Sequence, residues 1–193
     1  MAEKRYDFCI GTANSGLKKT VTTMLTGAGF YSSGEGKNIP FFLRTIRSVQ
    51  PWLAVVDTDL PPGNIEELAS IIENDGLAAA LYLNTGGTCL SQHVQLNWPV
   101  EAQVLTAVAK AICSEFARKK TLQKEIENLQ RKLYERKQIE KAKGMLVSHL
   151  LLNEEEAYRR LQKSSMEARI TLAEMAGRII SDPGFLSSLS RRR

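Results

Sequence analysis

Residues 139–180 read IEKAKGMLVSHLLLNEEEAYRRLQKSSMEARITLAEMAGRII, and this stretch decides how the C-terminal part of the chain folds. Small or apolar residues recur in it at spacings of three and four, in three successive groups. We expect three short helices, each too short to be stable alone in water, so they must pack together as a bundle. The groups are Ile139, Ala142, Met145, Leu146 and Leu150; Ala157, Leu161 and Ser165; and Leu172, Met175, Ala176 and Ile179.

The breaks between the predicted helices differ in clarity. Asn153 is a good N-cap for the second helix, and Glu154, Glu155 and Glu156 follow it where the helix dipole favours negative charge. No glycine or proline marks the start of the third helix. Periodicity alone therefore places that boundary near residues 167–170.

Several motifs with fixed spacings lie in this stretch: Ala142-Lys143-Gly144, residues 153–158 (NEEEAY), Leu161, Met166, and residues 172–176 (LAEMA). With these motifs the stretch resembles the ANTAR domain, the RNA-binding module of transcription antitermination regulators. The resemblance implies a three-helix fold that binds a paired-hairpin RNA signal in nascent transcripts. Binding of this kind prevents a terminator from forming.

Basic side chains on the same stretch agree with that function, because neutralising RNA phosphates requires cations. Glutamates interleave with them, so an ordinary solvated helix surface is the alternative. Tyr158 either stacks on an unpaired base or packs half-buried in the bundle. The candidate RNA-binding residues are Lys141, Lys143, Arg159, Arg160, Lys163 and Arg169.

Charge divides the chain of 193 residues, whose net charge is +5. Residues 1–114 hold 8 Lys or Arg against 10 Asp or Glu, and residues 115–193 hold 18 against 11. The C-terminal half is thus the one suited to a polyanion. Neither a hydrophobic signal segment nor a long apolar run is found, so we expect a cytoplasmic protein without membrane contact. Three scattered cysteines and two histidines predict buried thiols and no metal site.

Apolar runs alternate with helical patterns in the first half. Strands are expected at residues 6–11, 30–32, 52–56, 77–83 and 94–96, and helices at 17–25, 39–49 and 65–74, with a glycine-rich loop at Gly34 and Gly36. This alternation predicts an α/β domain with a doubly wound, five-stranded parallel sheet. Any site should lie at the carboxyl ends of the strands.

Asp57 ends the third predicted strand, Asp59-Leu60-Pro61 follows it, Thr85 follows the fourth strand and Pro99 the fifth. In this order of elements the domain resembles the receiver domain of response regulators. The resemblance implies that Asp57 is a phosphoacceptor and that Thr85 senses the phosphoryl group, with Asp59 nearby.

Two departures from the receiver pattern concern charge. Thr12 and Ala13 stand where receivers hold Mg²⁺ with an acidic pair, and Trp98 stands where they place a lysine. Phosphoryl transfer depends on a cation and a fixed positive charge. We therefore predict a degenerate receiver without a bound metal, although Asp59 could supply one ligand.

No helix breaker occurs from Val100 to Gly144, which predicts one long helix whose first part covers the sheet through Val104, Val108, Ala111 and Ile112. Its middle has a heptad pattern with Ile at a and Leu at d, a pattern that favours a parallel two-stranded coiled coil. A helix packed on its own receiver domain is the alternative. The expected dimerisation residues are Leu122, Ile126, Leu129 and Leu133.

The predicted organisation is a receiver-like domain (1–114), a coiled-coil helix (115–138), an ANTAR domain (139–181) and a basic tail (182–193). We expect an RNA-binding antitermination regulator that forms a homodimer, uses no cofactor and answers to a sensor kinase or another regulatory protein. The alternatives are a phosphorylation-controlled DNA-binding response regulator and a protein-only interaction module. An enzyme is not expected, because the sequence offers neither a nucleophile with its base nor a complete phosphate-binding glycine motif.

Overall fold

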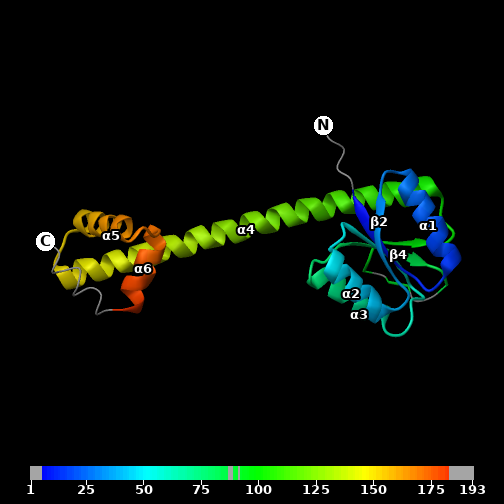
Figure 1. The fold of residues 1–193 in the computed structure, drawn as a ribbon, viewed down its shortest axis with the longest axis horizontal. Coiled ribbons are helices and arrows are strands. Elements are labelled where there is room, and N and C mark those ends of the chain that lie inside the picture. The colour runs from blue at the N-terminus through cyan, green and yellow to red at the C-terminus, as the bar shows by residue number, and fades with distance from the viewer. Residues whose placement is uncertain (1–5, 87–88, 91, 183–193) are drawn as a thin grey trace. The chain divides into compact units, whose positions relative to one another are not determined.

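The computed structural model describes residues 6–86, 89–90 and 92–182. Two compact units divide the chain between residues 121 and 122. The first unit contains a parallel sheet whose five strands run in the order β2-β1-β3-β4-β5, which confirms the predicted doubly wound sheet (Figure 1). The strands are β1 (Asp7–Gly11), β2 (Tyr31–Gly36), β3 (Leu53–Asp57), β4 (Ala79–Asn84) and β5 (Gln95–Asn97).

Helices cover both faces of the sheet because its strands are apolar on both sides. The helix α1 (Ser15–Gly27) and the first part of α4 (Ala102–Leu150) pack on one face. The helices α2 (Ile39–Val49) and α3 (Ile65–Asn74) pack on the other. Asparagine side chains cap the starts of α1, α2 and α3, at Asn14, Asn38 and Asn64.

The face that α4 turns to the sheet was predicted in part, since Val108 and Ile112 do pack against the core. Leu105, Ala109 and Cys113 are fully buried there, whereas Val104 is 43% exposed and Ala111 is exposed. The prediction was wrong by about one position for these two residues. The spacing of four places Leu105, Ala109 and Cys113 on one helix face, and Val108 and Ile112 lie beside it.

The strand β2 is longer than predicted, because Gly34 and Gly36 belong to it and not to a loop. A Cβ added at Gly36 would lie 2.6 Å from Cα of Phe42, and one at Gly34 would lie 2.6 Å from Cγ2 of Thr45. Helix α2 therefore packs directly on the backbone of β2. The glycines mark this close approach and do not end the strand.

The second unit is a bundle of three helices around its own core. Its first helix is the C-terminal part of α4, followed by α5 (Glu154–Ala168) and α6 (Leu172–Ser181). Gly144 does not interrupt α4, because a helix tolerates an isolated glycine at a modest cost. The buried core residues are Ala142, Leu146, Ala157, Leu161, Met175, Ala176 and Ile179.

Capping boxes begin both short helices. The side chain of Asn153 accepts from the backbone of Glu156, which confirms Asn153 as the N-cap of α5. Thr171 and Glu174 form the same arrangement at α6, so this helix begins at Leu172, two residues after the range predicted from periodicity. The missed signal was the TLAE sequence, which has the Thr-x-x-Glu spacing of a capping box.

None of the helices in the described residues combines the length and hydropathy needed to cross a membrane. Apart from Asp182, the predicted basic tail lies outside the described residues.

Replacing Gly36 by Ala should destabilise the first unit by about 1–3 kcal/mol, because the new Cβ meets backbone atoms of Phe42. Gly27→Ala is the matched control, since a Cβ there meets nothing within 4 Å and alanine favours the helix. Urea unfolding followed by tryptophan fluorescence measures this unit alone, because both tryptophans precede residue 121. Equal stabilities for the two variants would contradict the packing of α2 on β2.

Candidate functional site

Asp57 lies at the carboxyl end of β3 and is only 3% exposed. Thr12 follows β1 and Thr85 follows β4, the two strands that flank β3 in the sheet. Because these strands are parallel, their carboxyl ends meet at one edge, where the sequence predicts a site. We call Thr12, Asp57, Asp59 and Thr85 the Asp57 cluster.

Hydrogen bonds occupy both carboxylate oxygens of Asp57. The hydroxyl of Thr12 donates to Oδ2 at 2.6 Å, and the backbone N–H of Asp59 donates to Oδ1 at 3.1 Å. Oγ1 of Thr85 lies 2.7 Å from Oδ1 of Asp57 and 2.7 Å from Oδ2 of Asp59. The Thr85 hydroxyl has one proton, so it donates to one of these two oxygens at a time.

The structure thus brings Asp57, Asp59 and Thr85 together, as their order in the sequence predicts. The bond from Thr12 was not predicted, since the sequence analysis considered Thr12 only as a missing carboxylate. The position of Thr12 after a strand that pairs with β3 is the signal that could have indicated it.

The Asp57 cluster lacks the acidic pair with which receivers hold Mg²⁺, because Thr12 and Ala13 follow β1 instead. This cation is usually held by carboxylates and substrate phosphates in a strict octahedral geometry. The cluster supplies only the carboxylates of Asp57 and Asp59, and the hydroxyls of Thr12 and Thr85 already bond to them. Among the described residues, no group of three His, Cys, Asp or Glu side chains is placed to hold a metal ion.

Trp98, immediately before Pro99, stands where receivers place a lysine. The backbone N–H of Trp98 donates to the carbonyl of Asn84 at 2.8 Å, and the indole packs against the core between the sheet, α1 and α4. An indole carries no charge, and Asp57 makes no ion pair in the described part of the chain. The cluster therefore lacks the positive charge that stabilises a transferred phosphoryl group.

In the second unit, the ammonium of Lys143 lies between two carboxylates. Nζ is 2.8 Å from Glu140 on the same helix and 3.1 Å from Glu154 in the first turn of α5. The side chain of Lys143 is 15% exposed, and hydrogen bonds from Glu140 and then Glu154 raise the pKa of its ammonium. Lys143 therefore joins α4 to the start of α5.

The other predicted RNA-binding residues lie at the bundle surface. Lys141, Arg159, Lys163 and Arg169 are exposed, and Arg160 is partly exposed. Arg159 is 2.6 Å from Glu155, and Lys163 is 4.0 Å from Glu167, each at a spacing of four residues on α5. Exposed pairs of this kind are weak, so a phosphate can displace the glutamate.

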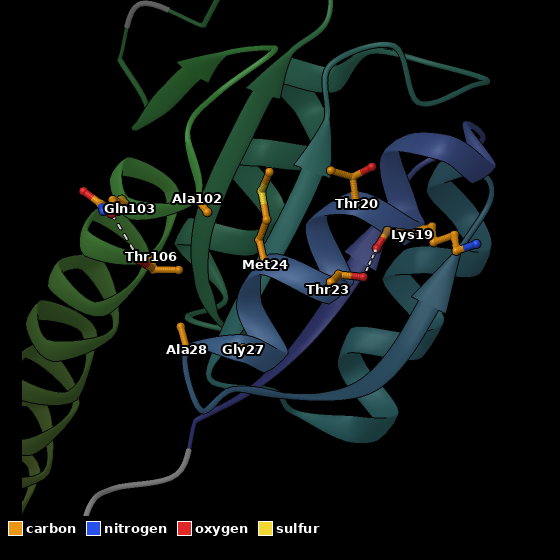
Figure 2. A pocket seen from close by; sticks show the side chains of 9 residues that line it. All are labelled: Lys19, Thr20, Thr23, Met24, Gly27, Ala28, Ala102, Gln103 and Thr106. Atoms are coloured by element: carbon orange, nitrogen blue, oxygen red, sulfur yellow. Dashed lines mark hydrogen bonds between the residues drawn. The ribbon is translucent and has the colours of Figure 1, made fainter.

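A groove of about 690 Å³ lies between α1 and the start of α4 (Figure 2). Its lining contains no carboxylate, histidine or cysteine. None of its residues belongs to the Asp57 cluster. They are Lys19, Thr20, Thr23, Met24, Gly27, Ala28, Ala102, Gln103 and Thr106.

Comparisons with known proteins agree with both halves of this description. Residues 127–180 match the family model of the ANTAR domain. No curated protein matches the sequence. The chain thus carries an ANTAR domain, formed by the second half of α4 with α5 and α6.

Solved receiver domains share the fold of the first unit. A receiver domain described as that of a Luxo repressor from Vibrio parahaemolyticus is 15% identical, with a TM-score of 0.54, covering 62% of this chain and 98% of the other. The receiver domain of a response regulator described as NarL from Mycobacterium tuberculosis is 13% identical, with a TM-score of 0.52. The match covers 57% of this chain and 98% of the other. NtrX from Brucella abortus, in complex with ATP, is 15% identical, with a TM-score of 0.52, covering 72% and 35%.

The protein therefore has a receiver-like domain followed by an ANTAR domain, the architecture of a response regulator.

Incubation of the full chain with acetyl phosphate and Mg²⁺ should add no phosphoryl group to Asp57, because the cluster lacks a cation site and a lysine. Intact-mass measurement checks this result, with Asp57→Asn as the matched control. A single phosphoryl group on the wild type that is absent from the variant would contradict it.

The capping box of α6 should make the bundle sensitive to acid. The backbone N–H of Thr171 and then its hydroxyl bond to the carboxylate of Glu174, and these bonds lower its pKa from the ordinary value of 4.5. A carboxyl group whose pKa is lower in the folded state than in the unfolded state stabilises the fold when the pH is above the ordinary pKa. This stabilisation is lost as the pH falls through the pKa of the folded state.

Wild type should therefore melt at a higher temperature than Glu174→Gln at neutral pH, and the difference should shrink as the pH falls below 4.5. Circular dichroism of the full chain across this range measures both melting temperatures. A difference that stays constant down to the acid limit of folding would show that the charge of Glu174 does not act through the cap.

Proposed function

We propose that the protein is an RNA-binding regulator of transcription antitermination. Its ANTAR domain binds hairpin RNA in nascent transcripts, and its receiver-like domain controls or dimerises the ANTAR domain without phosphoryl transfer. The observation that carries this proposal is the ANTAR match over residues 127–180, which includes a packed bundle with exposed basic side chains.

The chemistry of the bundle surface supports an RNA ligand. Lys141, Arg159, Lys163 and Arg169 reach solvent, where RNA phosphates can approach them. Tyr158 is 43% exposed and offers part of its ring for stacking on an unpaired base.

Lys143 has a different role in this proposal. Its ammonium is held by Glu140 and Glu154, so it positions α5 against α4 and is a poor first contact for phosphate. Removing it would leave two carboxylates facing each other across the helix junction without a cation. Its effect on RNA binding should come through the stability of the bundle.

Control of this regulator must come from a ligand or a partner that binds the receiver-like domain if the Asp57 cluster does not accept a phosphoryl group. A sensor kinase or another regulatory protein that binds the receiver-like domain fits this requirement. A second copy of the chain is a further partner, through the exposed apolar residues in the middle of α4.

Arg169→Ala should weaken binding to structured RNA and reduce the slope of log affinity against log salt by about one, with little change in melting temperature. The backbone at position 169 is left-handed (φ 54°), and arginine and alanine both carry a Cβ there, so the substitution adds no backbone strain. Lys143→Ala should lower the melting temperature of the bundle as well as the affinity.

Gel-shift titration with an RNA hairpin and with duplex DNA at several salt concentrations measures these effects. Lys18→Ala is a matched control, since Lys18 is a partly exposed cation of the first unit paired with Glu35. Stronger binding to duplex DNA than to the hairpin would favour a DNA-binding regulator. Absence of salt-dependent binding to either would favour a protein-only module.

A further inference from the structure

The middle of α4 exposes apolar side chains that belong to none of the hydrophobic cores formed by the described residues. Leu122, Ile126, Leu129 and Leu133 are 49%, 48%, 57% and 56% exposed, whereas Leu105 and Leu146 of the same helix are fully buried. The four lie at spacings of four, three and four, so they form one stripe along the helix. We call these four residues the seam.

We propose that the seam binds the seam of a second copy of this chain, and that the two α4 helices run antiparallel. This inference rests on the dimer in the proposed function and adds the direction of its helices. It departs from the parallel order that the Ile and Leu pattern favours. That pattern depends on Ile126 alone, because the other apolar a position is Leu133.

The number of apolar layers is the same for parallel and antiparallel helices. In a parallel pair each seam residue meets its own copy, which gives four layers. In an antiparallel pair Leu122 meets the partner's Leu133, and Ile126 meets the partner's Leu129, which again gives four layers. Lys119 and Arg136, at the next a and d positions, place like charges together in both directions.

The charged residues at positions e and g do differ between the two directions, and such residues set the orientation of a coiled coil. In a parallel pair, a g residue lies beside the partner's e residue of the next heptad. Lys132 would then face the partner's Lys137 on both sides of the dimer, and Glu125 would face the neutral Gln130. The parallel dimer therefore has two repulsive contacts and no attractive ones at these positions.

In an antiparallel pair, g residues lie beside g residues. Glu125 then faces the partner's Lys132, and the two-fold symmetry repeats this attractive contact. At the e positions Gln123 faces the partner's Gln130, which is neutral. Charge complementarity thus favours the antiparallel dimer through the two g–g contacts.

Ion pairing within the chain leaves these two groups available. Arg131 is 3.9 Å from Glu135, and Gln123 donates to Glu127 at 3.2 Å, so neighbouring side chains pair along their own helix. Neither Glu125 nor Lys132 makes an ion pair in the described residues, which include all of α4.

Sedimentation equilibrium of the full chain tests the direction through the sign of one substitution. Lys132→Glu should raise the dimer dissociation constant on the order of tenfold, because it replaces two attractive contacts by two repulsive ones. In a parallel dimer the same variant would pair with Lys137 and tighten association. The swapped variant Glu125→Lys with Lys132→Glu should return to the wild-type dissociation constant.

Lys124→Glu is the matched control, since it makes the same charge change at the outer f position. Tighter association of Lys132→Glu, or equal weakening of the dimer by Lys124→Glu, would overturn the antiparallel order. Neither result would bear on the proposal that the protein binds RNA. A wild-type chain that stays monomeric would overturn the dimer itself. The gel shift described above would still test RNA binding separately, because it needs no dimer.

Discussion

The structure depends on one helix that serves two hydrophobic cores. Leu105, Ala109 and Cys113 near the start of α4 are buried against the sheet, and Ala142 and Leu146 near its end are buried in the ANTAR bundle. Neither core is complete without its part of α4. The residues between them have no core to join, and this explains why apolar side chains there remain exposed.

The Asp57 cluster joins the strand-end aspartate of the receiver-like sheet to groups that follow the neighbouring strands. A hydroxyl from Thr12 takes the place of a metal-binding carboxylate and bonds to Asp57 directly. Oγ1 of Thr85 lies within hydrogen-bond distance of a carboxylate oxygen of Asp57 and of Asp59. The hydrogen bonds therefore join the ends of β1, β3 and β4, and the buried carboxylate is satisfied by donors on both oxygens.

Sequence reasoning predicted the features that local pattern determines. Continuous apolar runs indicated the central strands, and the order of strand ends brought Asp57 and Thr85 together. It did not predict β2 correctly, because glycines at Gly34 and Gly36 look like a loop until the approach of α2 is known. Pairing across the fold, as between Lys143 and Glu154 or Thr12 and Asp57, depends on tertiary contacts that spacing does not encode.

The central claim is that RNA binding belongs to the ANTAR domain and not to the receiver-like domain. Ultraviolet cross-linking of the full chain to a structured RNA, followed by peptide mapping, measures this most directly. The account predicts cross-linked peptides within residues 139–180, with Tyr158 and the exposed basic residues of α5 among them. Cross-links confined to residues before 121 would contradict it.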